Sequence, residues 1–183
     1  MTRPLLILLI TLGSNSFSLG QTETANNSPD IGFTVSVFIG VDCPVSQKYI
    51  TKLNSIYTDY KNRPEIKWVF IVPGDVKKRK IKSFAKEYKI QFPLKSDKPS
   101  QNVTGQTGAT VTPEVFIKRA GETLYRGAID NWFYELGKYR QKATSNYLID
   151  ALESVLKNQE PEIKETTPIG CLIQQSSSQA HHQ

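Results

Sequence analysis

Apolar residues along the chain recur with two spacings, one typical of strands and the other of helices. Residues 31–40 (IGFTVSVFIG) and 66–72 (IKWVFIV) are short runs rich in β-branched and aromatic side chains, so both are predicted to be buried strands. After Pro44, apolar positions repeat every three or four residues, which predicts a helix whose first turn contains that proline. The same spacing predicts a second helix over residues 76–88.

The second half of the chain adds a hairpin and a last helix. Residues 114–118 and 123–127 flank Ala120 and Gly121, which is a typical hairpin pattern, and residues 147–156 carry apolar side chains at helical spacing. Parallel strands need crossover helices, whereas a hairpin adds antiparallel strands to the same sheet. The order of elements therefore predicts an α/β fold with one mixed central sheet and helices on both faces.

The first residues of the chain have the pattern of an export signal. Arg3 precedes an apolar stretch at residues 5–12, and Ser18 and Gly20 put small residues at the −3 and −1 positions of a cleavage before Gln21. The apolar stretch is too short to span ~30 Å of hydrocarbon comfortably. We expect an exported protein, periplasmic or secreted, with no stable membrane anchor after cleavage, in a compartment where disulfides persist.

These patterns divide the chain of 183 residues into four parts. Residues 1–20 are the predicted signal peptide and residues 21–30 a flexible polar lead-in. Residues 31–158 form one domain of ordinary size, and residues 159–183 form a polar C-terminal tail that carries Cys171.

Basic residues outnumber acidic ones, 23 against 17, and many of them lie at residues 77–82. Such a run can bind an anionic partner, but Ile81, Phe84 and Tyr88 form an apolar stripe on the other side of the same predicted helix. No aromatic interleaving or nucleic-acid motif accompanies the run. It is interpreted as a solvated helix face, and no nucleic-acid partner is expected.

The reactive side chains of the chain point to sulfur chemistry. His181 and His182 are the two histidines and lie at the extreme C-terminus, so a histidine-based triad or metal site in the folded body is not expected. Cys43 and Cys171 are the two cysteines, too few for a closed zinc site. The sequence predicts neither a metal nor a cofactor.

Cys43 follows the first predicted strand and precedes the helix that contains Pro44. Sites in open α/β sheets lie at this end of the strands, and the N–H groups of a helix N-terminus stabilise a thiolate. The neighbouring Asp42 opposes that effect, because a nearby carboxylate disfavours a second negative charge. Cys43 is therefore a candidate nucleophile; the alternatives are a small buried apolar residue or one half of a structural disulfide.

The stretch VFIGVDCPVSQKY (residues 37–49), followed by ATVTPEVFI (residues 109–117), resembles the thioredoxin-fold redoxins. With residues 125–130 and 170–173, the chain is similar more narrowly to exported, peroxiredoxin-related redoxin-domain proteins. The resemblance implies a thioredoxin-like fold in which Thr112 and Pro113 form the cis-proline loop that faces Cys43 and binds substrate. Free backbone groups at such a loop can pair with an extended thiol substrate.

This family resemblance implies thiol–disulfide oxidoreductase activity or weak peroxide-reducing, antioxidant activity through Cys43, with a thiol or disulfide protein, or a peroxide, as partner. The chain departs from the family at three positions. Ser46 replaces the second cysteine of the Cys-x-x-Cys motif, and Ser36 and Gly40 stand where peroxiredoxins have proline and threonine. Without that threonine hydroxyl, efficient peroxide reduction is not expected.

Cys171 lies in a small apolar island of the tail, IGCLI. One hypothesis makes it a resolving cysteine on a mobile segment, which pairs with Cys43 during catalysis. The alternative is a non-catalytic redoxin-fold binding or accessory module, in which a permanent Cys43–Cys171 disulfide ties the tail down, worth ~4–5 kcal/mol. The sequence leaves both open.

Overall fold

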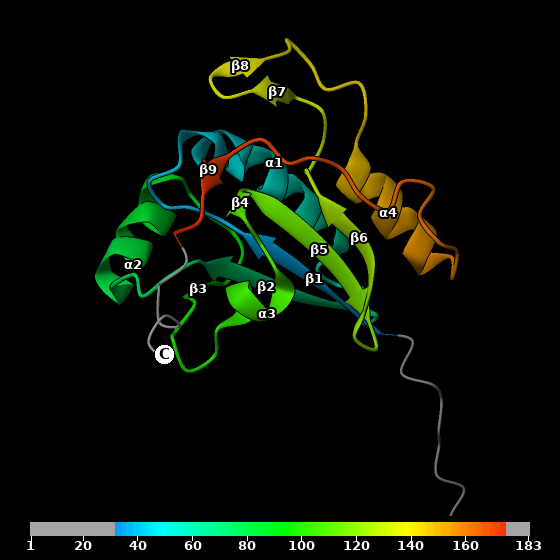
Figure 1. The fold of residues 1–183 in the computed structure, drawn as a ribbon, viewed down its shortest axis with the longest axis horizontal. Helices are drawn as coiled ribbons and strands as arrows, with labels where there is room; N and C mark the ends of the chain where they lie inside the picture. Colours follow the sequence, from blue (N-terminus) through cyan, green and yellow to red (C-terminus); the bar gives the residue numbers. More distant parts are fainter. Residues whose placement is uncertain (1–31, 175–183) are drawn as a thin grey trace, which may run out of the picture. The chain divides into compact units, whose positions relative to one another are not determined.

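The computed structural model describes residues 32–174 (Figure 1). The predicted signal peptide and lead-in lie outside these residues. The strands are β1 (Phe33–Phe38), β2 (Ile66–Val72), β3 (Leu94–Ser96), β4 (Val111–Thr112), β5 (Glu114–Arg119), β6 (Glu122–Gly127), β7 (Phe133–Glu135), β8 (Lys138–Tyr139) and β9 (Cys171–Leu172). The helices are α1 (Pro44–Tyr60), α2 (Lys78–Glu87), α3 (Val103–Thr107) and α4 (Tyr147–Leu156).

Five strands form the central sheet, in the order β3-β2-β1-β5-β6. β1, β2 and β3 run parallel to one another, while β5 is antiparallel to β1 and to β6. α1 connects β1 with β2, and α2 lies between β2 and β3, as parallel connections require. The predicted α/β fold with a mixed central sheet is confirmed.

The two faces of the sheet are covered unequally. α1, α2 and α4 contribute buried side chains to one large core with Val35, Val37 and Val115 of the sheet. A smaller core on the other face contains Phe38 and Phe116, and the short α3 lies beside it. Helices are thus found on both faces, as predicted, but the three longer helices all pack into the same core.

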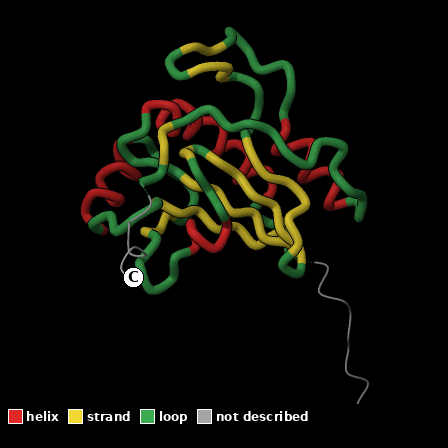
Figure 2. The backbone as a smooth tube through the Cα atoms, viewed as in Figure 1, coloured by secondary structure: helices red, strands yellow, loops and turns green. Residues whose placement is uncertain are grey.

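The tail predicted to begin at residue 159 packs against the domain through residue 173. We call residues 164–173 the strap. Figures 1 and 2 show it leaving the region of α4 as a loop and passing across the sheet to β9, which lies beside β4. Backbone hydrogen bonds, the short β9 and a few side chains hold the strap, rather than a helix or a long strand.

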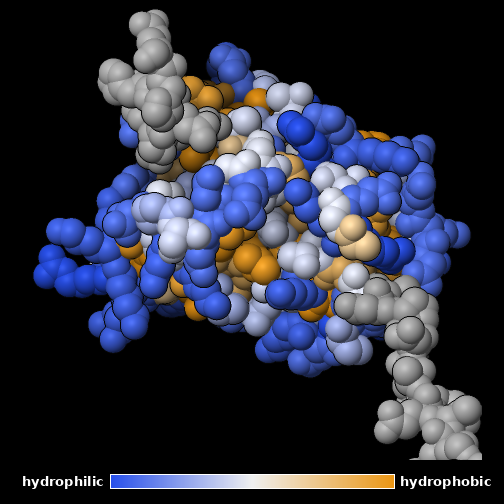
Figure 3. Space-filling view, turned by 60° about the horizontal axis from the view of Figure 1, so that its bottom comes forward, coloured by the Kyte–Doolittle hydropathy of each residue, from blue (hydrophilic) through white to orange (hydrophobic). Residues whose placement is uncertain are grey.

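Charged and polar side chains cover most of the face drawn in Figure 3, with small apolar areas between them. The large apolar side chains that are exposed within the described residues are Tyr134, Leu136, Tyr139, Ile163 and Leu172. Three of them belong to the short β7–β8 hairpin, which the sequence patterns did not predict. None of the helices in residues 32–174 is long and apolar enough to cross a membrane.

Candidate active site

Cys43 lies directly before α1 and caps its N-terminus, with Pro44 as the first helical residue. The Cys43 side chain is 3% exposed, and its Sγ donates a hydrogen bond to the carbonyl oxygen of Thr112 at 3.0 Å. The peptide bond between Thr112 and Pro113 is cis, as the family resemblance implies. The structure thus brings together Cys43 and Thr112, which are 69 positions apart in the chain.

Gly40 allows Thr112 to approach Cys43 closely. A Cβ atom at position 40 would lie 2.5 Å from Oγ1 of Thr112 and 2.8 Å from Cβ of Cys43. Both distances are shorter than real contacts allow, so any side chain at this position would push the two loops apart. Position 40 therefore lacks the threonine of peroxiredoxins, and the close approach of Thr112 and Cys43 leaves no room there for a peroxide-binding hydroxyl.

Ser46, which replaces the second cysteine of the family motif, contacts the sulfur of Cys43. Ser46 is fully buried, and its Oγ accepts a hydrogen bond from the backbone N–H of Gly40 at 3.1 Å. Its own backbone N–H and its hydroxyl both stabilise the Cys43 thiolate. The sequence patterns indicated only what Ser46 lacks; in the structure Ser46 lowers the pKa of Cys43.

The two thiols differ in acidity. Burial raises the pKa of Cys43, but the interactions with the Cys171 thiol, with the backbone N–H of Ser46 and with the Thr112 side chain together bring that pKa below its usual value. Burial, followed by the hydrogen bond and charge of Cys43, raises the pKa of Cys171 to about 11. Cys43 is consequently the thiol that ionises first, and Cys171 keeps its proton near neutral pH.

Asp42, expected to oppose the thiolate, is exposed and forms an ion pair. Its side chain is 76% exposed and its Oδ2 accepts a hydrogen bond from Nζ of Lys80 at 2.5 Å. Lys80 belongs to the basic run on α2, so one residue of that run lies beside the loop of Cys43. The positive charge of Lys80 offsets the carboxylate, which explains why Asp42 does not keep the Cys43 thiol protonated.

Cys171 lies in β9, which pairs antiparallel with β4 so that Cys171 is opposite Thr112 and Leu172 is opposite Val111. Both Cys43 and Cys171 are free thiols. The thiol of Cys171 is close enough to interact with that of Cys43, so Thr112 has a cysteine on either side.

The strap is anchored by contacts that do not involve sulfur. The backbone N–H of Thr166 donates to the carbonyl oxygen of Arg126 at 3.1 Å, and the N–H of Arg126 donates to that of Lys164 at 3.0 Å. The Thr166 hydroxyl accepts a hydrogen bond from the N–H of Ala128 at 2.9 Å and lies 2.9 Å from the hydroxyl of Tyr125. Thr166 therefore holds the strap on β6 while both thiols are free.

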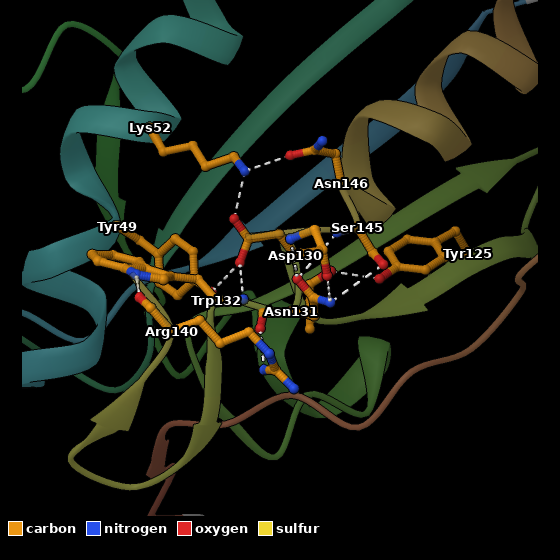
Figure 4. A network of polar contacts seen from close by, with 11 residues as sticks. Tyr49, Lys52, Tyr125, Asp130, Asn131, Trp132, Arg140, Ser145 and Asn146 are labelled. Carbon is orange, nitrogen blue, oxygen red and sulfur yellow. Dashed lines mark hydrogen bonds and ion pairs between the residues drawn. The ribbon is translucent and has the colours of Figure 1, made fainter. Parts of the chain in front are cut away.

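A second polar cluster ties α1 to the segment after β6 (Figure 4). Asp130 is 2% exposed; it accepts hydrogen bonds from the Tyr49 hydroxyl and from Nζ of Lys52, each at 2.5 Å. Nζ of Lys52 also donates to Asn146, the residue before α4, at 2.7 Å. Burial and the Asp130 carboxylate raise the pKa of Tyr49, so the tyrosine stays a hydrogen-bond donor. No sequence pattern predicted this role for Asp130.

The contacts of this cluster indicate a structural role. It joins α1, the loop before β7 and the start of α4, and each Asp130 oxygen is satisfied by donors of the chain itself. Within residues 32–174, no group of three or more His, Cys, Asp or Glu side chains could hold a metal ion. Within residues 32–174, the candidate reactive groups are therefore the thiols of Cys43 and Cys171.

A central mixed sheet, a cysteine at the N-terminus of the helix after β1 and a facing Thr-Pro loop define a thioredoxin-fold redoxin. The model of the AhpC/TSA family matches residues 21–126, more than half of the chain. The chain belongs to the AhpC/TSA family. The predicted recognition as a thioredoxin-fold redoxin is confirmed.

Solved structures with similar folds cover most of the chain. A hypothetical protein from Sinorhizobium meliloti 1021 is 26% identical with a TM-score of 0.68. The aligned region covers 81% of this chain and 82% of that protein's chain. An uncharacterised conserved protein from Geobacillus kaustophilus is 25% identical with a TM-score of 0.65, covering 80% and 79%. A candidate thioredoxin from Neisseria meningitidis, 19% identical with a TM-score of 0.51, covers 74% and 83% and supports the fold alone. No curated protein matches the chain.

Proposed function

We propose that this chain is an exported thiol–disulfide oxidoreductase in which Cys43 is the nucleophile and Cys171 the resolving cysteine. The observation that carries the proposal is a buried thiol of lowered pKa at a helix N-terminus, with a second thiol of higher pKa held across Thr112. Thr112 and Pro113 form the edge that substrate contacts. The partner is a protein that carries a disulfide or a thiol.

The reaction proceeds in two exchange steps. The Cys43 thiolate attacks one sulfur of the partner's disulfide, the partner's S–S bond breaks, and the departing thiolate takes up a proton. Cys171 then loses its proton and attacks the Cys43 sulfur, so that the mixed disulfide breaks and the second partner thiol leaves. The partner gains two electrons, and Cys43 and Cys171 are oxidised to a disulfide.

The order of the two attacks follows from the pKa values. Burial and the Cys43 sulfur raise the pKa of Cys171 to about 11, so Cys171 is a poor nucleophile while Cys43 is free. Once Cys43 is bound in a mixed disulfide, it carries no negative charge. The part of the pKa shift that Cys43 causes is then lost, and Cys171 ionises more readily when its attack is needed.

Two observations favour this activity over the alternatives. Gly40 leaves no space for the hydroxyl expected in a peroxide site, which argues against peroxide reduction as the main activity. Thr166 and its neighbours anchor the strap through contacts that do not involve sulfur, so a permanent disulfide is not required to fix the tail. A labile disulfide fits this arrangement better than a static one.

A redox titration of the full chain in glutathione and dithiothreitol buffers, with thermal melts of the oxidised and reduced forms, tests the proposal. We expect a Cys43–Cys171 disulfide with a potential above about −300 mV and only a small change in melting temperature on reduction. A lower potential together with a loss of more than about 10 °C would make the disulfide a structural one. Thiols that never pair would rule out Cys171 as the resolving residue.

A further inference from the structure

The strap crosses the edge of β4 in an extended conformation that places successive side chains in different environments. Beyond the pairing of Cys171 with Thr112, the backbone N–H of Ile173 donates a hydrogen bond to the carbonyl oxygen of Thr110 at 2.8 Å. Residues 169–173 are therefore bound to the loop before Pro113 as an added strand, the geometry in which proteins bind extended peptides.

Gly170 lies where no side chain fits. A Cβ atom there would lie 2.1 Å from the carbonyl oxygen of Thr112 and 3.1 Å from the nitrogen of Pro113. These are backbone atoms, so a rotation of a side chain cannot relieve the collision. The residue immediately before the cysteine must be glycine for the segment to lie this close to Thr112.

The apolar side chains two positions before and two positions after Cys171 are packed, while the one directly after it is exposed. Ile169 lines a small cavity together with Tyr49, Pro113 and Phe133, with room for about one water molecule. Ile173 packs against the smaller core around Phe38 and Phe116. Leu172, between Cys171 and Ile173, is 83% exposed.

We propose that the edge of β4 and these two apolar sites form a docking groove for an extended protein segment in which a cysteine follows glycine. The segment carries aliphatic side chains two positions before and two after the cysteine, while the position directly after it is unrestricted. The chain's own residues 169–173 occupy this groove between reactions. The proposal rests on the function proposed above and names the substrate class of the same site.

Self-occupation of the groove has a mechanistic consequence. A partner segment and the strap cannot both pair with Val111 and Thr112, so the partner must displace the strap before its sulfur reaches Cys43. When the strap returns with Cys171, it displaces the partner segment from the same groove. Resolution of the mixed disulfide and departure of the partner are then a single event.

The groove can be tested with peptides whose cysteine is joined to thionitrobenzoate through a disulfide. The protein is the full chain carrying Cys171→Ser, in which Cys43 is the sole thiol. Attack by the Cys43 thiolate forms a Cys43–peptide disulfide and releases the coloured thionitrobenzoate anion, so the rate is read directly. The reference peptide is Pro-Ile-Gly-Cys-Leu-Ile-Gln, with three variants: Ala for Gly, Ser for the first Ile, and Ser for Leu.

We expect the alanine peptide and the first serine peptide each to react about ten-fold more slowly than the reference, whereas serine for leucine changes nothing. Adding Gly170→Ala to the protein should accelerate all four peptides by loosening the strap, and adding Leu172→Ser should not. Circular dichroism melts verify that both variants fold.

The outcomes separate this proposal from the function on which it rests. Equal rates for all four peptides, with normal reactivity towards the small hydroxyethyl disulfide, would overturn the groove and leave the oxidoreductase activity intact. An unchanged rate in the Gly170→Ala protein would overturn the self-occupation. Failure of Cys43 to react with any disulfide would overturn the proposed function itself.

Discussion

Cys43 and Cys171 lie on either side of Thr112 but are held in opposite ways. Cys43 joins β1 to α1, and both elements contribute several buried apolar residues to the main core. Cys171 lies on a strap that binds the domain through a few backbone hydrogen bonds and the side chain of Thr166. Segments with few buried contacts open locally at low free-energy cost. In the reaction that we propose, the attacking thiol is therefore the fixed one, and the resolving thiol is the one that moves.

Removing each thiol in turn gives the largest expected effects. Cys43→Ser should reduce the rate of disulfide reduction at least ~100-fold, because no nucleophile remains at the helix N-terminus. Cys171→Ser should still carry out the first exchange but stop at the mixed disulfide. Mass spectrometry of acid-quenched reactions distinguishes the two products. Activity that survives in Cys43→Ser would place the chemistry elsewhere.

The second-largest effect is expected from a substitution that weakens the strap but leaves both thiols in place. Thr166→Val removes the hydroxyl that accepts from Ala128 and contacts Tyr125, which should weaken the strap by about 1–2 kcal/mol. We expect amide exchange in residues 164–173 to accelerate ~5–30-fold while the core amides are unaffected, as measured by hydrogen–deuterium exchange. If amide exchange accelerated equally across the domain, the strap would not open independently of the core.

A smaller effect should follow from Ser46→Ala, which removes the hydroxyl of Ser46 from the surroundings of Cys43. The serine lowers the pKa of Cys43, so its loss should move the midpoint of the pH–alkylation curve to higher pH. At neutral pH a smaller fraction of Cys43 is then ionised, and the rate falls a few-fold; above the midpoint the variant reacts at least as fast as wild type. Gln47→Ala is the matched control on the same helical turn. An unchanged midpoint would contradict the role of Ser46.

Asp42→Asn should have the smallest effect of the four. The carboxylate is exposed and paired with Lys80, so its removal should leave the pKa of Cys43 close to the wild-type value. The same pH–alkylation curve measures it. A clear drop in that pKa would mean that Asp42 acts on the thiolate despite its ion pair.

The sequence predicted the elements around Cys43 and named Cys171 as a candidate partner, but it did not show how the strap packs on the domain. Apolar periodicity located β1, α1 and β2, because their burial requires a regular spacing of side chains. It also placed Cys43 at the correct end of the sheet. The strap has only the short apolar stretch at residues 169–173: the rest of it is held by backbone hydrogen bonds and by the Thr166 side chain, and these leave no periodic signal.

Two side chains were misjudged for a related reason. Asp130 was given no role of its own, because nothing local reveals that Tyr49 and Lys52 on α1 provide its partners. Ser46 was interpreted as a lost cysteine, because its contact with the Cys43 sulfur depends on the geometry of the helix N-terminus. Contacts between distant segments decide both roles, and a single sequence does not display them.

The position of the strap on β6 also bears on solubility. β6 is the outermost strand of the central sheet, and its free edge offers backbone groups on which another chain could pair. The strap occupies part of that edge, where Arg126 exchanges hydrogen bonds with Lys164 and Thr166. A chain cut after residue 158 would lose its second thiol and also this protection against edge-to-edge association. The segment that carries Cys171 thus also covers backbone groups at the edge of the sheet.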